Sequence, residues 1–159
     1  MGDKTKDLAE LVAQIEEQET RLVFRTFTTA DAWRLGCALV ARAEADRAPV
    51  AIDIRRGEQQ LFHAALAGSN ADNDAWIERK CRLVRRFGVS SYLFGRRLAL
   101  SGRTFGEATL LDPTHYAAHG GAFPITVQGV GPVGSVAVSG LPQADDHQMV
   151  VDVLTEFLG

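Results

Sequence analysis

One lysine of this sequence occupies a position where a charge is unexpected. The segment 74–87 has helical periodicity, and at about 100° per residue its apolar side chains fall on one arc of the helix. These apolar residues are Trp76, Ile77, Cys81, Leu83, Val84 and Phe87. Lys80 lies in the middle of that arc, where a charge is unfavourable unless it reaches water or meets an anion. Two interpretations follow: Lys80 snorkels or pairs with an acid of the chain such as Asp53, or it points into a pocket and holds a ligand carboxylate.

Two histidines lie four residues apart, and one of them is the second candidate for chemistry. His115 and His119 have the spacing that puts two imidazoles on one helical face, where they can bind a metal. Pro113 precedes them and Gly120-Gly121 follow, which leaves room for only one helical turn, so we predict no metal site. His119 beside glycines that expose their backbone amides favours a pocket that a ligand approaches closely. The alternative is a structural histidine in a glycine-rich loop.

The other motifs give no catalytic centre. Gly129, Gly131 and Gly134 match the G-x-G-x-x-G pattern of dinucleotide-binding proteins, but an alternating strand follows them where that pattern requires a helix. The glycines therefore predict a hairpin turn. The sequence contains no G-x-S-x-G, H-E-x-x-H or P-loop motif. Since no nucleophile or acid–base pair stands out, the sequence leaves open whether the chain is an enzyme.

Charge is unevenly distributed along the 159 residues, which carry 17 basic and 20 acidic side chains and a net charge of −3. Residues 79–103 are rich in arginine and contain no acid. An acidic protein whose arginines are not interleaved with an aromatic stacking platform is not expected to bind nucleic acid. The arginines are expected to be solvated or to pair with acidic faces of other copies in an oligomer. No apolar run approaches the roughly 18 residues that span a bilayer, and the charged start lacks a secretory signal, so we expect a cytoplasmic protein that does not bind membranes.

The elements that position these residues follow from periodicity and turn signals. Helices are expected at 6–19, from a capping signal of Thr28 with Asp31 to before Pro49, at 74–87, after Ser90 or Ser91 and at 143–158. Strands are expected at 21–27, 50–56, 59–66, 122–129 and 133–140. Hairpins with helices between them favour an α+β fold with a largely antiparallel sheet. We therefore expect a single domain over residues 21–159, preceded by an N-terminal amphipathic helix in residues 1–20.

Four stretches of the sequence together carry a more specific signal. They are AIDIRRGEQQLFHAAL (51–66), NDAWIERKCRLVRRFG (73–88), YAAHGGAFPI (116–125) and VGSVAVSGLPQADDHQMVV (133–151). The chain resembles the haem-degrading domain family, the GlcG/HbpS-like group, and most closely its branch of small stand-alone uncharacterised proteins. The resemblance implies a profilin-like three-layer α/β/α arrangement, with a five-stranded antiparallel sheet and helices on both faces. It also implies assembly as dimers or larger rings, and some members of the family bind haem or are linked to its breakdown.

The resemblance also implies which residues form the site. The family's motif residues correspond here to Lys80, to Gly120, Gly121, Pro124 and Ile125, and to the Ser139-Gly140 turn before the last helix. This branch departs from the family by inserting Ala122-Phe123 within the Gly-Gly-Pro segment.

These patterns together predict a small-molecule-binding domain. Its pocket is expected between the helix of Lys80, the Gly120-Gly121 loop and the start of the last helix after Ser139. Anionic groups of the ligand are expected to meet Lys80, backbone amides and Arg55, while His119 ligates or hydrogen-bonds. Haem or another carboxylated cofactor is the expected ligand class. The alternative is an oligomeric structural or adaptor protein with no catalytic activity, in which the leader helix and the opposed charge blocks serve assembly.

Overall fold

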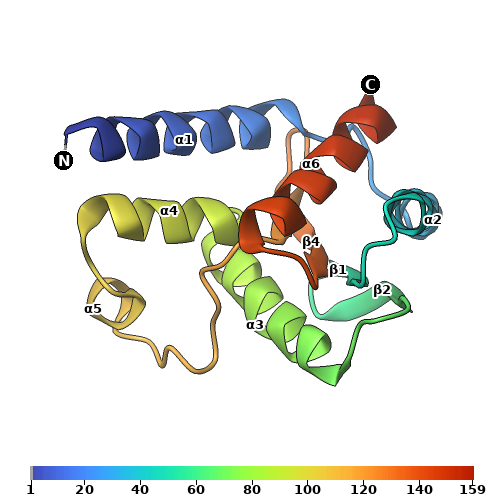
Figure 1. Cartoon of the computed structure of the whole chain (residues 1–159). Helices are drawn as coiled ribbons and strands as arrows, with labels where there is room; N and C mark the ends of the chain where they lie inside the picture. The colour runs from blue at the N-terminus through green and yellow to red at the C-terminus, as the bar shows by residue number, and fades with distance from the viewer. Residues whose placement is uncertain (1) are drawn as a thin grey trace.

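Helices and strands account for most of the chain (Figure 1), and the computed structural model describes residues 2–159. The helices are α1 (Gly2–Arg21), α2 (Thr29–Ala45), α3 (Ala71–Phe87), α4 (Ser91–Ser101), α5 (Phe105–Thr109) and α6 (Gln143–Leu158). The strands are β1 (Ala51–Arg56), β2 (Gln59–Ala65), β3 (Ala122–Val127) and β4 (Gly131–Ser139). Among these elements, no helix is long and apolar enough to cross a membrane. The α+β class predicted from the sequence is confirmed.

The sheet is antiparallel throughout and has the strand order β2-β1-β4-β3. Two sequential hairpins, β1-β2 and β3-β4, meet through β1 and β4 at its centre. Gly57 and Gly129, both at positive φ, lie at the two hairpin turns, where the left-handed backbone region favours glycine. The pattern G-x-G-x-x-G thus opens a strand, as the sequence predicted.

The expectation of a five-stranded sheet is wrong, because residues 21–27 do not form a strand of it. This segment keeps the alternation of a strand, with Leu22 and Phe24 buried, yet it makes only an isolated parallel bridge between Phe24 and Val127. The helix α1 runs through Arg21, and Thr28 already caps α2 by bonding the amide of residue 31. The short segment left between the two helices pairs at the end of β3 through two backbone hydrogen bonds and no further.

Helices cover both faces of the sheet, and the two faces differ in side-chain size. On one face, β-branched side chains such as Ile52 and Val138 pack against α2 and α6 and form the main core. On the other face, small residues meet α3, among them Ala51 and Ala137. Because successive side chains of a strand point to opposite faces, neighbouring residues of β1 and β4 supply both layers. The small side chains let α3 lie close to the sheet.

The leader helix α1 packs beside α4 (Figure 1). Val12 and Ile15 of α1 form a small apolar cluster with residues of α4. The Glu19 carboxylate accepts hydrogen bonds from the backbone N–H and the hydroxyl of Ser90, at 3.1 and 3.0 Å, and so caps α4. Burial raises the pKa of Glu19 to about 7. The contact joins the leader helix to the rest of the fold.

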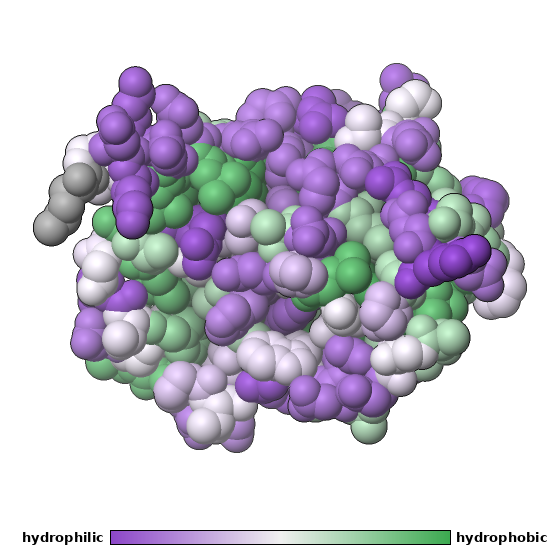
Figure 2. Space-filling view, viewed as in Figure 1, coloured by the Kyte–Doolittle hydropathy of each residue, from purple (hydrophilic) through white to green (hydrophobic). Residues whose placement is uncertain are grey.

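The outer surface in the same view is mostly hydrophilic along the upper edge, where α1 lies (Figure 2). More apolar side chains gather on the left, over α4 and α5. Leu110, which follows α5, is 90% exposed.

Gly95 of α4 lets the following loop pass close to this helix. A β-carbon at Gly95 would collide with the Ala118 carbonyl oxygen. Gly95→Ala is therefore expected to lower the free energy of unfolding by about 1–3 kcal/mol, as overpacking does. Urea denaturation measures the change, and Gly106→Ala is the matched control because nothing lies within 4 Å of a β-carbon there. Equal stability of the two variants would show that the loop does not need this close approach.

Candidate functional site

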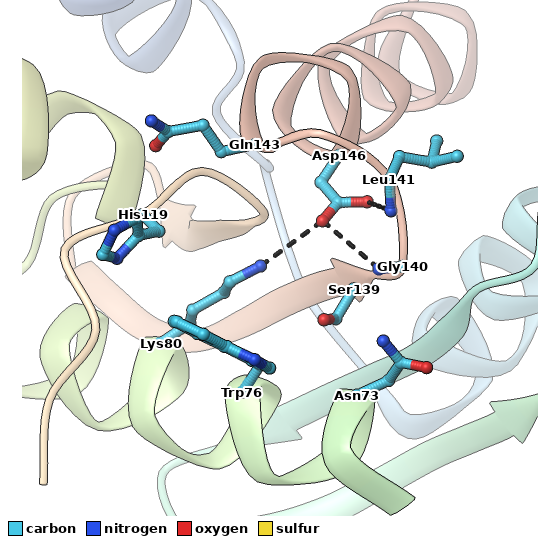
Figure 3. A pocket seen from close by; sticks show the side chains of 9 residues that line it. All are labelled: Asn73, Trp76, Lys80, His119, Ser139, Gly140, Leu141, Gln143 and Asp146. Atoms are coloured by element: carbon cyan, nitrogen blue, oxygen red, sulfur yellow. Dashed lines mark hydrogen bonds and ion pairs between the residues drawn. The ribbon is translucent and has the colours of Figure 1, made fainter. Parts of the chain in front are cut away.

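A cavity of about 260 Å³ lies at the end of β4, between α3, the start of α6 and the loop before β3 (Figure 3). Its lining residues are Asn73, Trp76, Lys80, His119, Ser139, Gly140, Leu141, Gln143 and Asp146. His119 and Gly140 are exposed, whereas Lys80, Ser139 and Asp146 are buried. The cavity therefore opens at the surface and has its charged groups at its inner end.

Lys80 extends from α3 into this cavity (Figure 3) and is 3% exposed. Its Nζ lies 3.4 Å from Oδ2 of Asp146. Burial lowers the pKa of Lys80, and the negative charge of Asp146 opposes that shift. A β-carbon at Gly121 would lie 2.7 Å from Nζ, and the φ of +138° at this glycine also excludes other residues. Gly121 therefore makes room for the ammonium group.

Asp146 is the acid that pairs with Lys80, which makes the expectation of Asp53 wrong. Asp146 lies in the first turn of α6, and its carboxylate accepts the N–H of Leu141 at 2.9 Å and that of Gly140 at 3.4 Å. Burial raises its pKa to about 6, against the lowering effects of Lys80 and of these amides. The turn after β4 thus wraps around an internal carboxylate.

His119 stands at the mouth of the cavity. Its ring meets the Trp76 ring edge-on, with 5.4 Å between the centroids. Partial burial, followed by the positive charges of Lys80, Arg96 and Arg79, lowers the pKa of His119. A neutral imidazole with no hydrogen-bond partner in residues 2–159 is free to accept a proton or to bind a metal-centred ligand.

Arg55 does not reach the cavity, contrary to the sequence-based expectation. Its guanidinium bonds Asp53 at 2.7 Å and Glu78 at 2.9 Å, and these partners raise its pKa. In the register between β1 and β4, Arg55 pairs with Ser135, four residues from the cavity end of β4, which is about 13 Å along the strand. Arg55 therefore serves an ion-pair network on the α3 side of the sheet.

The remaining predicted residues lie in or next to the cavity. Ser139 and Gly140 line it. Gly120 contacts the lining residue Gln143: its N–H donates to Oε1 of Gln143 at 3.0 Å, and a β-carbon at Gly120 would collide with the Gln143 carbonyl. His115 is separate from His119 and lies 3.9 Å from Asp112. Within residues 2–159, no group of three or more His, Cys, Asp or Glu side chains is placed to hold a metal ion.

Sequence reasoning missed the lining residues Asn73, Trp76, Leu141, Gln143 and Asp146. Two of them had a usable signal, because Asn73 and Trp76 precede Lys80 by seven and four positions on one helical face. Asp146 had none, since an acid in a first helical turn is explained by the helix dipole alone.

Hydrogen-bond donors outnumber acceptors in this cavity. The Asn73 side chain accepts from the N–H of Asn70 through Oδ1, so its amide NH₂ remains for the cavity. The Gln143 amide is fixed in the same way by Gly120. Together with the hydroxyl of Ser139 and the ammonium of Lys80, these groups face one carboxylate, that of Asp146. Such a set suits a ligand that carries an anionic group.

Comparisons with known proteins agree with the fold and identify relatives. A sequence model of the family described as "Haem degrading protein HbpS-like" matches residues 27–155. A UPF0303 protein of Streptomyces coelicolor is 61% identical over 155 residues, which cover 98% of each chain. The crystal structure of the Ybr137w protein has a TM-score of 0.86 and 35% identity, covering 96% of this chain and 94% of that one. A structure titled as a complex of PduOC with haem has a TM-score of 0.69 at 15% identity, over 82% and 94% of the two chains, and shows the fold alone.

Loss of the Lys80 ammonium should make stability depend on pH. In Lys80→Met, Asp146 keeps its burial and loses its counter-ion, so its pKa in the folded state rises above about 6. A carboxyl whose folded-state pKa is raised favours folding at low pH, and that contribution disappears as the pH rises through the folded-state pKa. We therefore expect a loss of roughly 3 kcal/mol at pH 8 and a smaller loss at pH 5, measured by urea unfolding against the wild type.

The double variant Lys80→Met/Asp146→Asn is the control, because it lacks both charges. Its stability relative to the wild type is expected to change less between the two pH values. The same loss at pH 5 and pH 8 in the single variant would mean that Asp146 does not depend on Lys80.

Proposed function

The chain belongs to the HbpS-like family of haem-degrading proteins, and we propose that it binds a small carboxylated ligand in the cavity of Lys80 and His119. The ligand carboxylate would meet the Lys80 ammonium and the donors of Ser139 and Asn73. Its remaining part would lie against Trp76 and reach the cavity mouth at His119.

The excess of donors at the buried end of the cavity is the observation that supports this proposal most directly. A buried ammonium requires compensation, and Lys80 has one acidic partner at 3.4 Å, which leaves two of its N–H groups without a protein partner in residues 2–159. Arg79 and Arg96 add positive charge near the cavity mouth, and both lower the pKa of the nearby His119. An anion entering from the surface therefore passes through a region of positive potential.

The description of the family names haem, and the residues that line the cavity fit haem in part. His119, whose pKa is lowered, would bind the haem iron through its imidazole, and Lys80 would pair with a propionate. The cavity of about 260 Å³ lies just below the roughly 300–1,000 Å³ of pockets that enclose a drug-sized ligand. A cavity of this size would enclose part of a haem. Bound haem would supply iron-centred redox chemistry.

Binding of two probes tests the proposal: lactate by titration calorimetry and haemin by visible absorbance. We expect saturable binding of at least one probe at one molecule per chain. Lys80→Met should weaken lactate binding at least about tenfold, since a charge-assisted hydrogen bond contributes roughly 1.5–3 kcal/mol. His119→Ala should abolish the Soret shift of haemin. His115→Ala is the matched control, because His115 lies outside the cavity.

Non-saturable binding of both probes, or binding that neither Lys80→Met nor His119→Ala changes, would contradict the proposal. Circular dichroism of each variant separates a lost site from a lost fold.

A second candidate function, assembly into an oligomer, rests on an exposed aromatic residue. Trp33 is 63% exposed, and its ring meets that of Phe62 in the edge strand β2 edge-on, with 5.5 Å between the centroids. Within residues 2–159, strand β2 pairs with β1 and has no strand on its other side. An exposed tryptophan beside an unpaired strand edge is typical of a contact between copies.

The solution mass tests this assembly. Light scattering at micromolar concentration should give a multiple of the 17.2 kDa chain mass, and Trp33→Arg should reduce it towards one chain. A mass of 17.2 kDa for the wild type would contradict assembly.

A further inference from the structure

Lysine is rare in this chain, and its placement is informative. The sequence contains 14 arginines and three lysines, of which Lys4 and Lys6 lie in the first turns of α1. The third, Lys80, is the buried residue whose Nζ faces the cavity. Arginine would hold a carboxylate with two parallel hydrogen bonds and never loses its proton, whereas a buried lysine can become a neutral amine. Lys80, the buried lysine of residues 2–159, therefore lies where a neutral amine, and not only a positive charge, is available.

The surroundings of Lys80 match what an amine nucleophile requires. Nζ lies 3.4 Å from the Asp146 carboxyl group, which is itself 2% exposed and held by the amides of residues 140 and 141. Burial lowers the pKa of the lysine and raises that of the acid, and both shifts favour transfer of a proton from Nζ to the carboxylate. A nucleophile and a proton donor thus share one cavity.

We propose that Lys80 forms an imine with the carbonyl carbon of a small 2-oxo acid bound in this cavity. The inference rests on the proposed function, because the ligand carboxylate uses the site described above. It adds that the ligand carries a carbonyl group next to its carboxylate. Ser139 and Asn73 would orient that carboxylate, and Trp76 would cover the reacting carbon from the solvent side.

The step balances with the groups present. Asp146 accepts a proton from the Lys80 ammonium, and the neutral amine attacks the carbonyl carbon. The carbonyl oxygen takes up the proton from Asp146, which gives a carbinolamine. The carbinolamine nitrogen at this point still carries two protons. One of them passes through Asp146 to the hydroxyl, which leaves as water when the C–O bond breaks, and a protonated C=N bond replaces C=O. No oxidant or reductant takes part.

Reductive trapping tests the inference on the full-length protein. Pyruvate and sodium borohydride are added together, and the intact mass and the modified peptide are determined by mass spectrometry. We expect one reduced pyruvyl group per chain, on Lys80 and not on Lys4 or Lys6. Lactate, which has a hydroxyl in place of the carbonyl, is the matched control and should leave the mass unchanged while protecting Lys80 from pyruvate.

Two variants separate the roles of the paired groups. Lys80→Arg keeps the positive charge and should abolish trapping at this position. Asp146→Asn should slow trapping roughly 100-fold, as expected for the loss of a general acid–base. The peptide map of the wild type decides the assignment even if either variant folds poorly.

The outcomes distinguish the inference from the proposed function. Binding of lactate without trapping of pyruvate on Lys80 overturns the imine and leaves the carboxylate site intact. Trapping that is equally fast on Lys4 and Lys6 also overturns it. Absence of both lactate binding and pyruvate trapping overturns the imine, and absence of haemin binding as well overturns the proposed function.

Discussion

The buried ion pair between Lys80 and Asp146 is the interaction on which the cavity depends. Removing two charges from water is unfavourable, and their mutual attraction compensates only when hydrogen bonds satisfy the remaining polar groups. Here the turn after β4 supplies them, since the N–H groups of Gly140 and Leu141 both point at the Asp146 carboxylate. The ion pair therefore fixes the start of α6 against α3 at the inner end of the cavity.

The side chains on the two faces of the sheet differ in size, and this difference brings α3 close enough for Lys80 to reach Asp146. Ile52 and Val138 fill the space beneath α2 and α6, while Ala51 and Ala137 on the opposite face leave α3 close to the strands. A larger residue in place of these alanines would push α3 outward and separate Lys80 from Asp146. The positive charges around His119 and the donors that line the cavity have their effect only because this close packing holds them together.

The sequence was informative wherever a local pattern decides the structure. Helical phase placed Lys80 on the inner face of α3, and turn signals placed both hairpins. It misled where distant segments decide, because the acid that pairs with Lys80 is 66 residues away in the sequence. Arg55 was assigned to the cavity by charge alone, and the strand register pairs it with Ser135 in the middle of β4, four residues from the cavity. The fifth strand failed because the segment 22–27, held between α1 and the cap of α2, meets β3 through the single bridge between Phe24 and Val127.

The protonation and contacts of Lys80 can be observed directly by ¹⁵N NMR of the lysine side chains, since the chain has three lysines and so three Nζ signals. The central claim is that Lys80 is a buried cation, shared between Asp146 and a ligand carboxylate. It predicts that lactate shifts the Nζ signal of Lys80 and leaves those of Lys4 and Lys6 in place. A Lys80 signal that stays unchanged while calorimetry reports lactate binding would contradict the claim.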